Sequence, residues 1–270
     1  AYKNDLMQFY HSDHDCVVSY IEYLTDSTIK TNTLRRKIAS LKVFYSYLMT
    51  QNLITENPFN QLRFQYRTEK TLPKIIPHNI LKNLYVYLKQ RVITSKTNFQ
   101  RQKAERNLLI VSLLLSTGIR ISELCHIQIK NINLQNQTLH ILGKGKKERI
   151  IFLGDETTVL LLKTYLANYC KQSDKYLFPG KISQKPLTEQ SVRLVLKTVR
   201  EQMNLANSIT PHMFRHSFAT MLLDNDVDIR YIQQILGHSS ISITQIYTHV
   251  SQSKQKEILT SYNPIASIHT

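Results

Sequence analysis

The segment of this sequence whose residues are best suited to catalysis is Thr210-Pro-His-Met-Phe-Arg-His-Ser-Phe-Ala-Thr220. Thr210 followed by Pro211 is typical of a helix start, because a hydroxyl caps free backbone N–H groups and proline suits the first helical position. His212 and Arg215 are three residues apart and therefore share one face of this helix. A guanidinium offers a planar fork of donors and an imidazole offers a proton near neutral pH, so the pair is suited to a phosphate.

A second arginine stands at the end of the most hydrophobic segment. Leu108-Leu-Ile-Val-Ser-Leu-Leu-Leu predicts a buried helix that stops at Thr117-Gly118, and Arg120 follows the stop. A buried arginine is costly unless it is paired, and Glu123 at i+3 is a candidate partner. The plain interpretation of Arg120 is a salt bridge at a helix end.

Three lysines, a histidine and a tyrosine complete the candidate set. Lys144, Lys146 and Lys147 lie in Gly143-Lys-Gly-Lys-Lys-Glu, between two strand-like segments, and predict either a soluble turn or a lysine presented into a groove. Spacing alone does not choose among them. His238 follows a glycine stop, where histidines commonly cap helices, and Tyr247 is one of 15 tyrosines, any of which could be a core residue.

Composition indicates a polyanionic partner. The chain has 270 residues, enough for two ordinary domains, and its 42% hydrophobic content supports a real core. Lys and Arg number 35 against 19 Asp and Glu, a net charge of +16, which favours nucleic acid as the partner. Cys16, Cys125 and Cys170 are scattered, which argues against disulfides and a zinc site and fits a reducing cytoplasm. No apolar run predicts a membrane span or signal peptide.

Residues 1–66 are predicted to form a helical DNA-binding domain. Its main helix, 31–48, has apolar residues at spacings of three and four, namely Leu34, Ile38, Leu41, Phe44 and Leu48. Another face of this helix carries Arg35, Arg36, Lys37 and Lys42, which we interpret as a DNA phosphate contact rather than an ordinary solvated face. Residues 67–76 are polar and contain proline, as is typical of a linker.

Residues 77–270 are predicted to form the second domain, mainly α-helical with a small β-hairpin. The hairpin comprises Gln137-Thr-Leu-His-Ile-Leu and Arg149-Ile-Ile-Phe-Leu. The expected helices cover 78–89, 101–116, 156–172, 188–203, a segment from 211, and 229–236. The tail, about 251–270, is expected to be an amphipathic helix or an extended segment.

Taken together and in order, the segments containing Arg120, Lys144, His212 with Arg215, and His238 with Tyr247 closely resemble the tyrosine recombinases, the family of phage integrases, Xer-type dimer resolvases and transposon resolvases. The resemblance implies a helical core-binding domain and an α/β catalytic domain that form a C-shaped clamp on duplex DNA. Ile119 and Phe214 depart from the usual leucines, and both are apolar exchanges.

The resemblance also implies roles. Tyr247 would be the nucleophile that forms a 3′-phosphotyrosyl link, and Arg120 and Arg215 would clamp the phosphate. Lys144 would be the general acid and His212 would assist removal of the tyrosine proton. His238 would donate a hydrogen bond to the phosphate, Glu123 would support Arg120, and the other hairpin lysines would contact DNA.

The family pattern further implies strand exchange through a Holliday junction, without ATP, cofactor or metal. His212 and His216 are spaced like a zinc pair, but the third ligand and acidic base of that pattern are missing. Partners would be duplex DNA with inverted-repeat half-sites and a homotetramer coupled by the tail through Ile258 and Leu259. The sequence leaves open whether an accessory protein or a second recombinase is also needed. The setting would be the bacterial cytoplasm, at the nucleoid.

Three alternatives remain open at the sequence level. A topoisomerase IB-like enzyme would share the chemistry, but the helical N-terminal domain and the tail favour a recombinase. An architectural DNA-binding protein would explain the charge but not the six spaced residues. A metal-dependent nuclease is the most distant alternative. Within the recombinase interpretation, integration, excision, transposition and resolution by a mobile element or a chromosomal enzyme all share these motifs.

Overall fold

The computed structural model describes residues 14–60, 62, 74–142, 148–171, 173–180, 184–237 and 252–269. The chain divides into two compact units, Ala1–Leu72 and Pro73–Thr270. The described residues are mostly helical, with one small sheet, as the sequence predicted. None of the helices in these ranges has the length and apolar character needed to cross a membrane.

The first unit contains the helices α2 (His14–Asp26) and α3 (Thr31–Thr50), which pack on each other. Leu34, Ile38 and Leu48 are buried as expected, but the prediction for Phe44 was wrong. Phe44 is 40% exposed, and Tyr45 is buried in its place. Both positions fit helical spacing. Tyr45 is the buried one because its ring packs against the ring of Phe59, with 5.6 Å between the ring centroids.

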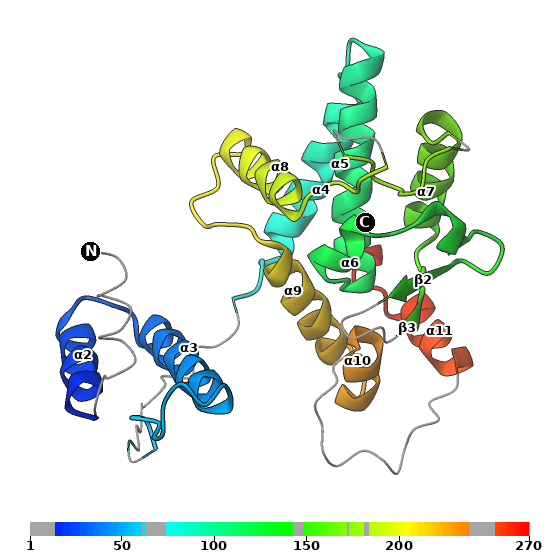
Figure 1. Ribbon diagram of the computed structural model, residues 1–270. Helices are drawn as coiled ribbons and strands as arrows, with labels where there is room; N and C mark the ends of the chain where they lie inside the picture. The colour runs from blue at the N-terminus through cyan, green and yellow to red at the C-terminus, as the bar shows by residue number, and fades with distance from the viewer. Residues whose placement is uncertain are drawn as a thin grey trace. The chain divides into compact units, whose positions relative to one another are not determined.

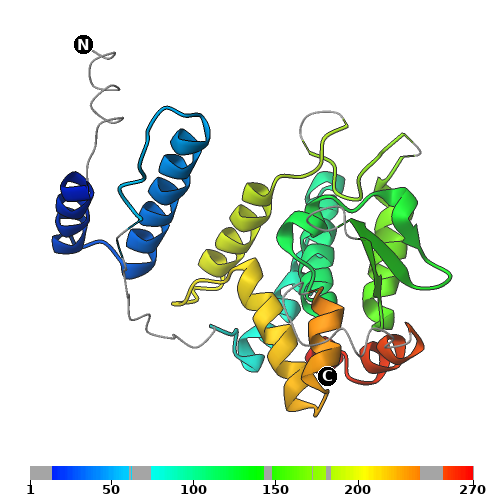
Figure 2. The same ribbon diagram turned by 60° about the horizontal axis from the view of Figure 1, so that its bottom comes forward.

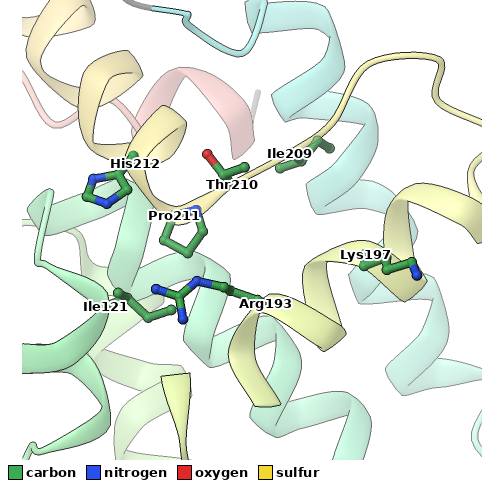
Figure 3. A pocket seen from close by; sticks show the side chains of 7 residues that line it. All are labelled: Ile121, Arg193, Lys197, Ile209, Thr210, Pro211 and His212. Atoms are coloured by element: carbon green, nitrogen blue, oxygen red, sulfur yellow. The ribbon is translucent and has the colours of Figure 1, made fainter. Parts of the chain in front are cut away.

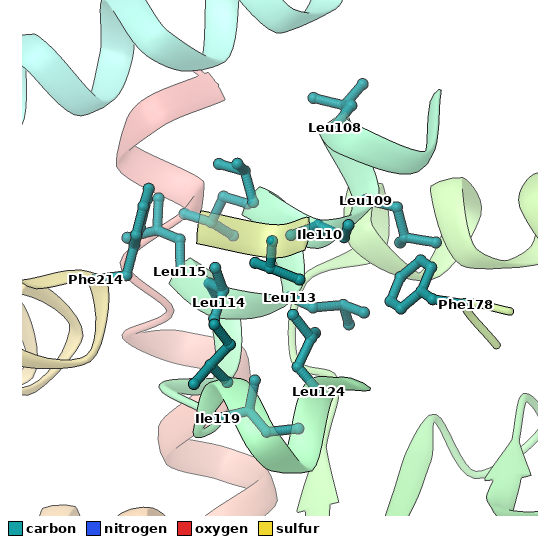
Figure 4. Packing of buried hydrophobic residues seen from close by; sticks show 14 of the residues in the cluster. Leu108, Leu109, Ile110, Leu113, Leu114, Leu115, Ile119, Leu124, Phe178 and Phe214 are labelled. Atoms are coloured by element: carbon teal, nitrogen blue, oxygen red, sulfur yellow. The ribbon is translucent and has the colours of Figure 1, made fainter. Parts of the chain in front are cut away.

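The second unit is built around one apolar helix (Figures 1 and 2). Its α5 (Asn98–Thr117) contacts α4 (His78–Ile93), α7 (Glu156–Tyr169) and α9 (Pro211–Asp224). Every residue from Leu108 to Thr117 is buried, as the apolar run predicted. Phe214 of α9 packs at one side of α5, and Phe178 packs at another (Figure 4). The remaining helices of this unit are α6 (Ile121–Cys125), η1 (Ile129–Asn131), α8 (Glu189–Gln202), α10 (Ile229–Leu236), α11 (Gln252–Ser261) and α12 (Ala266–His269).

The sheet is the predicted hairpin plus one extra strand. β2 (Thr138–Leu142) pairs antiparallel with β3 (Glu148–Phe152), with Leu139 opposite Ile151. β1 (Ile132–Asn133) adds to the free edge of β2. The sequence did not predict β1, because two residues are too few to show an alternating pattern.

Two glycines end helices at positions where the backbone is left-handed. Gly118 ends α5 with φ 60°, and Gly237 ends α10 with φ 65°. A Cβ on Gly118 would stand 2.6 Å from Phe218 and 2.7 Å from Leu236. These close approaches bring the end of α5, the middle of α9 and the end of α10 together.

The C-terminal helices pack on their own unit. Ile258 and Leu259 of α11 are buried against Phe218, Leu222 and other residues of α9 and α10. Gly154, just after β3, leaves no room for a side chain, because a Cβ there would stand 1.8 Å from the Leu259 carbonyl oxygen. Within the single chain the tail is therefore part of the domain core.

Candidate active site

Arg120 lies where α5 ends and α6 begins. Its backbone N–H donates to Glu123 Oε2 at 2.9 Å, and its Nη1 donates to Glu123 Oε1 at 2.9 Å. Its Nη2 donates to the carbonyl oxygen of Gly237 at 2.9 Å. The side chain is still 35% exposed, so Arg120 is fixed on two sides and keeps an accessible face.

Glu123 also binds a second arginine, from the sheet. Arg149 on β3 donates from Nη1 to Oε1 at 2.6 Å and from Nη2 to Oε2 at 2.9 Å, a two-pronged ion pair. Burial alone would raise the pKa of the Glu123 carboxyl, but the hydrogen bonds and charge of Arg149, and then the bonds from Arg120, lower it below its ordinary value. Glu123 is therefore a carboxylate at neutral pH.

Arg215 projects from α9 into the junction of three helices. Its Nη1 donates to the Gly118 carbonyl and its Nη2 to the Leu236 carbonyl, both at 2.7 Å. These oxygens belong to the negative ends of α5 and α10, which favour a cation. Burial, followed by the charges of Arg120 and Arg149, lowers the pKa of Arg215 to about 10, so it stays protonated at neutral pH.

His212 lies in the first turn of α9, where Thr210 caps the helix by accepting a hydrogen bond from the Met213 N–H. Its side chain is exposed and lines a pocket of about 330 Å³ between α6, α8 and α9. Arg193 of α8 extends beneath Pro211 towards this pocket (Figure 3). His212 and Arg215 thus leave the same helix, one towards solvent and one towards the helix junction.

His216 occupies the next turn of α9 and is exposed. Burial, then the charges of His212 and Arg215, lower the pKa of His216 below its ordinary value. Among the residues described, no group of three or more His, Cys, Asp or Glu side chains is arranged to hold a metal ion.

Five predicted site residues lie outside the described residues: Lys144, Lys146, Lys147, His238 and Tyr247. Their neighbours along the chain are described. β2 and β3 flank the lysine segment, and Gly237, whose carbonyl holds Arg120, immediately precedes His238.

The predicted DNA-contact residues of the first unit lie on α3. Arg35, Arg36 and Lys37 are exposed and Lys42 is half-buried. Arg36 and Lys37 also line an open hollow of about 420 Å³ with Tyr20, Ser40 and Leu41. The three exposed cations are therefore accessible to a polyanion, and their contact with DNA stays a prediction.

The second unit concentrates positive charge where the ends of α5 and α10 meet α9. Arg120 and Arg149 bond to one carboxylate, Glu123, and Arg215 lies within its electrostatic field, so positive charge is in excess. Donors fixed in advance around a site of excess charge stabilise an anion without reorganising when it arrives. A phosphate that gains negative charge during a reaction fits this arrangement.

Comparison with known proteins identifies the family. Residues 84–254 match the Phage integrase family. A tyrosine recombinase of Agathobacter rectalis is 46% identical over 100% of this chain and 91% of its own length. The chain is a tyrosine recombinase. A second relative, tyrosine recombinase XerC of Pediococcus pentosaceus, is 34% identical over 91% of the chain and 80% of its own length.

Solved structures share the fold of this tyrosine recombinase. The XerH site-specific recombinase, bound to a palindromic difH substrate in a post-cleavage complex, superimposes with a TM-score of 0.68 at 22% identity, covering 93% of this chain and 72% of XerH. The XerA recombinase superimposes with a TM-score of 0.53 at 27% identity, covering 95% of this chain and 88% of XerA. The family match and the two tyrosine recombinase relatives give the activity of this enzyme class as site-specific DNA recombination.

One member of the arginine cluster in this tyrosine recombinase escaped sequence reasoning. Arg149 stands at the end of the lysine motif and opens a predicted strand, and the sequence gives it no role, yet it makes the shortest ion pair to Glu123. The two residues are 26 positions apart, so neither helical nor strand spacing connects them. Only the path of β3 past α6 brings them together.

Proposed function

We propose that this tyrosine recombinase cuts and rejoins DNA with Tyr247 as nucleophile and with Arg120 and Arg215 as the phosphate clamp. The observation that supports this most strongly is where the two guanidiniums are bonded. They hold the carbonyls of Gly118, Leu236 and Gly237, and the chain then continues directly into the segment with His238 and Tyr247. The clamp is thus anchored to the start of the nucleophile segment.

The reaction follows from these assignments. The Tyr247 phenolic oxygen attacks the backbone phosphorus while His212 assists removal of its proton. The bond from phosphorus to the 5′-oxygen breaks, and Lys144 protonates that oxygen. The products are a 3′-phosphotyrosyl link and a free 5′-hydroxyl, so the bond energy is stored and no ATP is needed. Arg120, Arg215 and His238 stabilise the charge that builds on the non-bridging oxygens.

Covalent trapping tests this function. The protein is incubated in EDTA with a pool of nicked duplexes, so that the released strand diffuses away, and the products are run on a denaturing gel. A protein–DNA adduct in EDTA is the expected result, and sequencing the trapped strand gives the cleavage site. Salt-sensitive binding without any adduct, also after cell extract is added to supply accessory proteins, would contradict the proposal.

The α3 cations are proposed to contact DNA phosphates. Replacing Arg35, Arg36 and Lys37 together with glutamine should weaken binding to all duplexes and reduce the slope of log affinity against log salt by up to about 3, roughly one per lost phosphate contact. Exchanging arginine for lysine and lysine for arginine at the same three positions keeps the charge and serves as the control. An unchanged slope in the glutamine variant would show that these three cations do not contact DNA phosphates.

We further propose that four protomers act together on two sites with inverted half-sites, and that the tail couples them. In the isolated chain Ile258 and Leu259 fill their own domain's core. In the tetramer the same two side chains would fill the equivalent site on a neighbouring protomer and anchor α11 there. Truncation after residue 252 should leave half-site binding measurable but abolish synapsis and strand exchange. Thermal unfolding of the truncated protein controls for loss of the core contact. Full strand exchange by the truncated protein would exclude this coupling role.

We propose a Xer-type resolution role rather than integration, excision or transposition, on the ground that several relatives are named XerC or XerD. Because the substrate is DNA, the proposed working location is the bacterial nucleoid. A second recombinase or a DNA-bending protein would take part if trapping needs cell extract.

A further inference from the structure

The contact that the proposed mechanism leaves unused is the ion pair between Arg149 and Glu123. The pair is bidentate, with two hydrogen bonds of 2.6 and 2.9 Å between the guanidinium and the carboxylate. A bidentate pair fixes the plane of the carboxylate as well as its position. The Glu123 side chain is 4% exposed and that of Arg149 is 16% exposed. The pair is therefore shielded from solvent, and Arg149 has little surface with which to contact DNA itself.

The same carboxylate holds Arg120. Glu123 Oε1 accepts from both Arg149 Nη1 and Arg120 Nη1, and Oε2 accepts from both Arg149 Nη2 and the Arg120 backbone N–H. The orientation of the Arg120 guanidinium therefore depends on an acceptor whose own orientation Arg149 sets.

Gly237 adds a second connection. A Cβ at Gly237 would stand 2.9 Å from Arg149 Nη1 and 3.1 Å from its Cδ, so the backbone of Gly237 lies against the Arg149 side chain. The carbonyl of the same glycine accepts from Arg120 Nη2. Arg149 thus supports both groups that Arg120 binds, the carboxylate and the carbonyl.

We infer that Arg149 is a positioning residue of the cleavage reaction, which fixes Glu123 and Gly237 and through them the phosphate-binding guanidinium of Arg120. Arg149 also belongs to β3, the strand that follows the lysine segment. The ion pair therefore connects the base of the lysine hairpin to α6. Arg149 is thus linked both to the hairpin of the proposed general acid, Lys144, and to the proposed phosphate-binding residue, Arg120. This inference rests on the proposed function of Arg120 and Lys144.

The test measures the rate of adduct formation at saturating protein on the nicked duplex, and the dissociation constant separately. Arg149→Gln should slow adduct formation by about 10²-fold, the usual effect of misplacing a reacting group, while binding changes by less than about threefold. Arg149→Lys keeps the charge but not the two-pronged geometry, and should slow the reaction by about tenfold. The matched control is Arg101→Gln, which breaks the ion pair with Glu105 in the same unit, where the Arg101 side chain is 62% exposed and that of Glu105 is 10% exposed.

A double-mutant cycle distinguishes positioning from an independent contact. The effects of Glu123→Gln and Arg149→Gln on the rate should be non-additive, because both act through Arg120. The rate of the double variant should lie within about threefold of the rate of the slower single variant. Additive losses would overturn the inference, since Arg149 would then act on DNA or on folding by a separate route.

The pH profile supplies a readout that a purely structural role would not move. Glu123 faces Arg120, which immediately precedes α6, and Arg149 on β3, and it lies in the field of Arg215 on α9. With Arg149 in place the pKa of Glu123 is lowered, so its bonds to Arg120 are lost only when the pH falls below the ordinary titration range of a glutamate. In Arg149→Gln, burial dominates and the carboxyl takes up a proton at higher pH, so the rate should fall earlier on acidification than in wild type. Arg149→Lys should keep the wild-type profile.

The failure of the proposed function and the failure of the positioning role give different results. If wild type forms no adduct, the proposed function fails and the role of Arg149 falls with it. If wild type forms the adduct and both Arg149 variants react at the wild-type rate with the wild-type pH profile, only the role of Arg149 is wrong. Arg149→Lys makes this distinction even where Arg149→Gln does not fold, which thermal unfolding shows.

Discussion

Replacing Tyr247 with phenylalanine should abolish the covalent protein–DNA adduct. The substitution removes one oxygen, the proposed attacking atom, and leaves the aromatic ring in place. Binding to the same duplex should change little, because the phosphate clamp and the basic face of α3 are untouched. The measurement is the denaturing gel of the trapping assay together with a binding titration.

Tyr262→Phe is the matched control, since it removes the same oxygen from a tyrosine that is 44% exposed near the C-terminus. It should form the adduct at the wild-type rate. An adduct of undiminished yield in Tyr247→Phe would assign the nucleophile to another residue.

Replacing Arg215 with lysine should slow adduct formation by about 10²- to 10³-fold, which corresponds to about 3 to 4 kcal/mol of transition-state stabilisation. Lysine keeps one positive charge but cannot donate to two carbonyls and a phosphate oxygen from a single planar group. Binding of the uncleaved duplex should fall much less, because the clamp acts most strongly on the charge that develops during the reaction.

Stability gives a second measure of the same residue. The charge of Arg215 disfavours folding at every pH below its lowered pKa of about 10, yet its two hydrogen bonds satisfy the buried carbonyls of Gly118 and Leu236. Arg215→Lys loses the planar fork whose two nitrogens reach these carbonyls and should cost about 1–3 kcal/mol of unfolding free energy. Arg101→Lys, at a partly exposed ion pair with Glu105, is the control. If the Arg215→Lys protein formed the adduct at the wild-type rate, Arg215 would be excluded from the phosphate clamp.

Local signals in the sequence predicted the elements that carry the site. Thr210 with Pro211 predicted the start of α9, and Gly118 and Gly237 marked the ends of α5 and α10. These features could be predicted because caps and left-handed glycines act within a few residues of the chain. The apolar run of α5 was equally clear, since a helix that is apolar on all sides has to be buried.

Features that depend on distant partners were not predictable in this way. The choice of Tyr45 over Phe44 depends on Phe59, and the pairing of Arg149 with Glu123 depends on how β3 crosses α6. The partner of Arg120 at i+3 could be anticipated, but its bond to Gly237, 117 residues away, could not. Spacing rules describe a single element, whereas these contacts arise from packing between elements.

The most direct test of the proposed mechanism is to identify the atom that joins protein to DNA. The wild-type adduct is trapped in EDTA, digested with protease and nuclease, and its DNA-linked peptide is sequenced by mass spectrometry. We expect a phosphodiester between Tyr247 and the 3′ end of the cut strand, with a free 5′-hydroxyl on the other side of the break. A link through any other residue, or through the 5′ end, would contradict the mechanism.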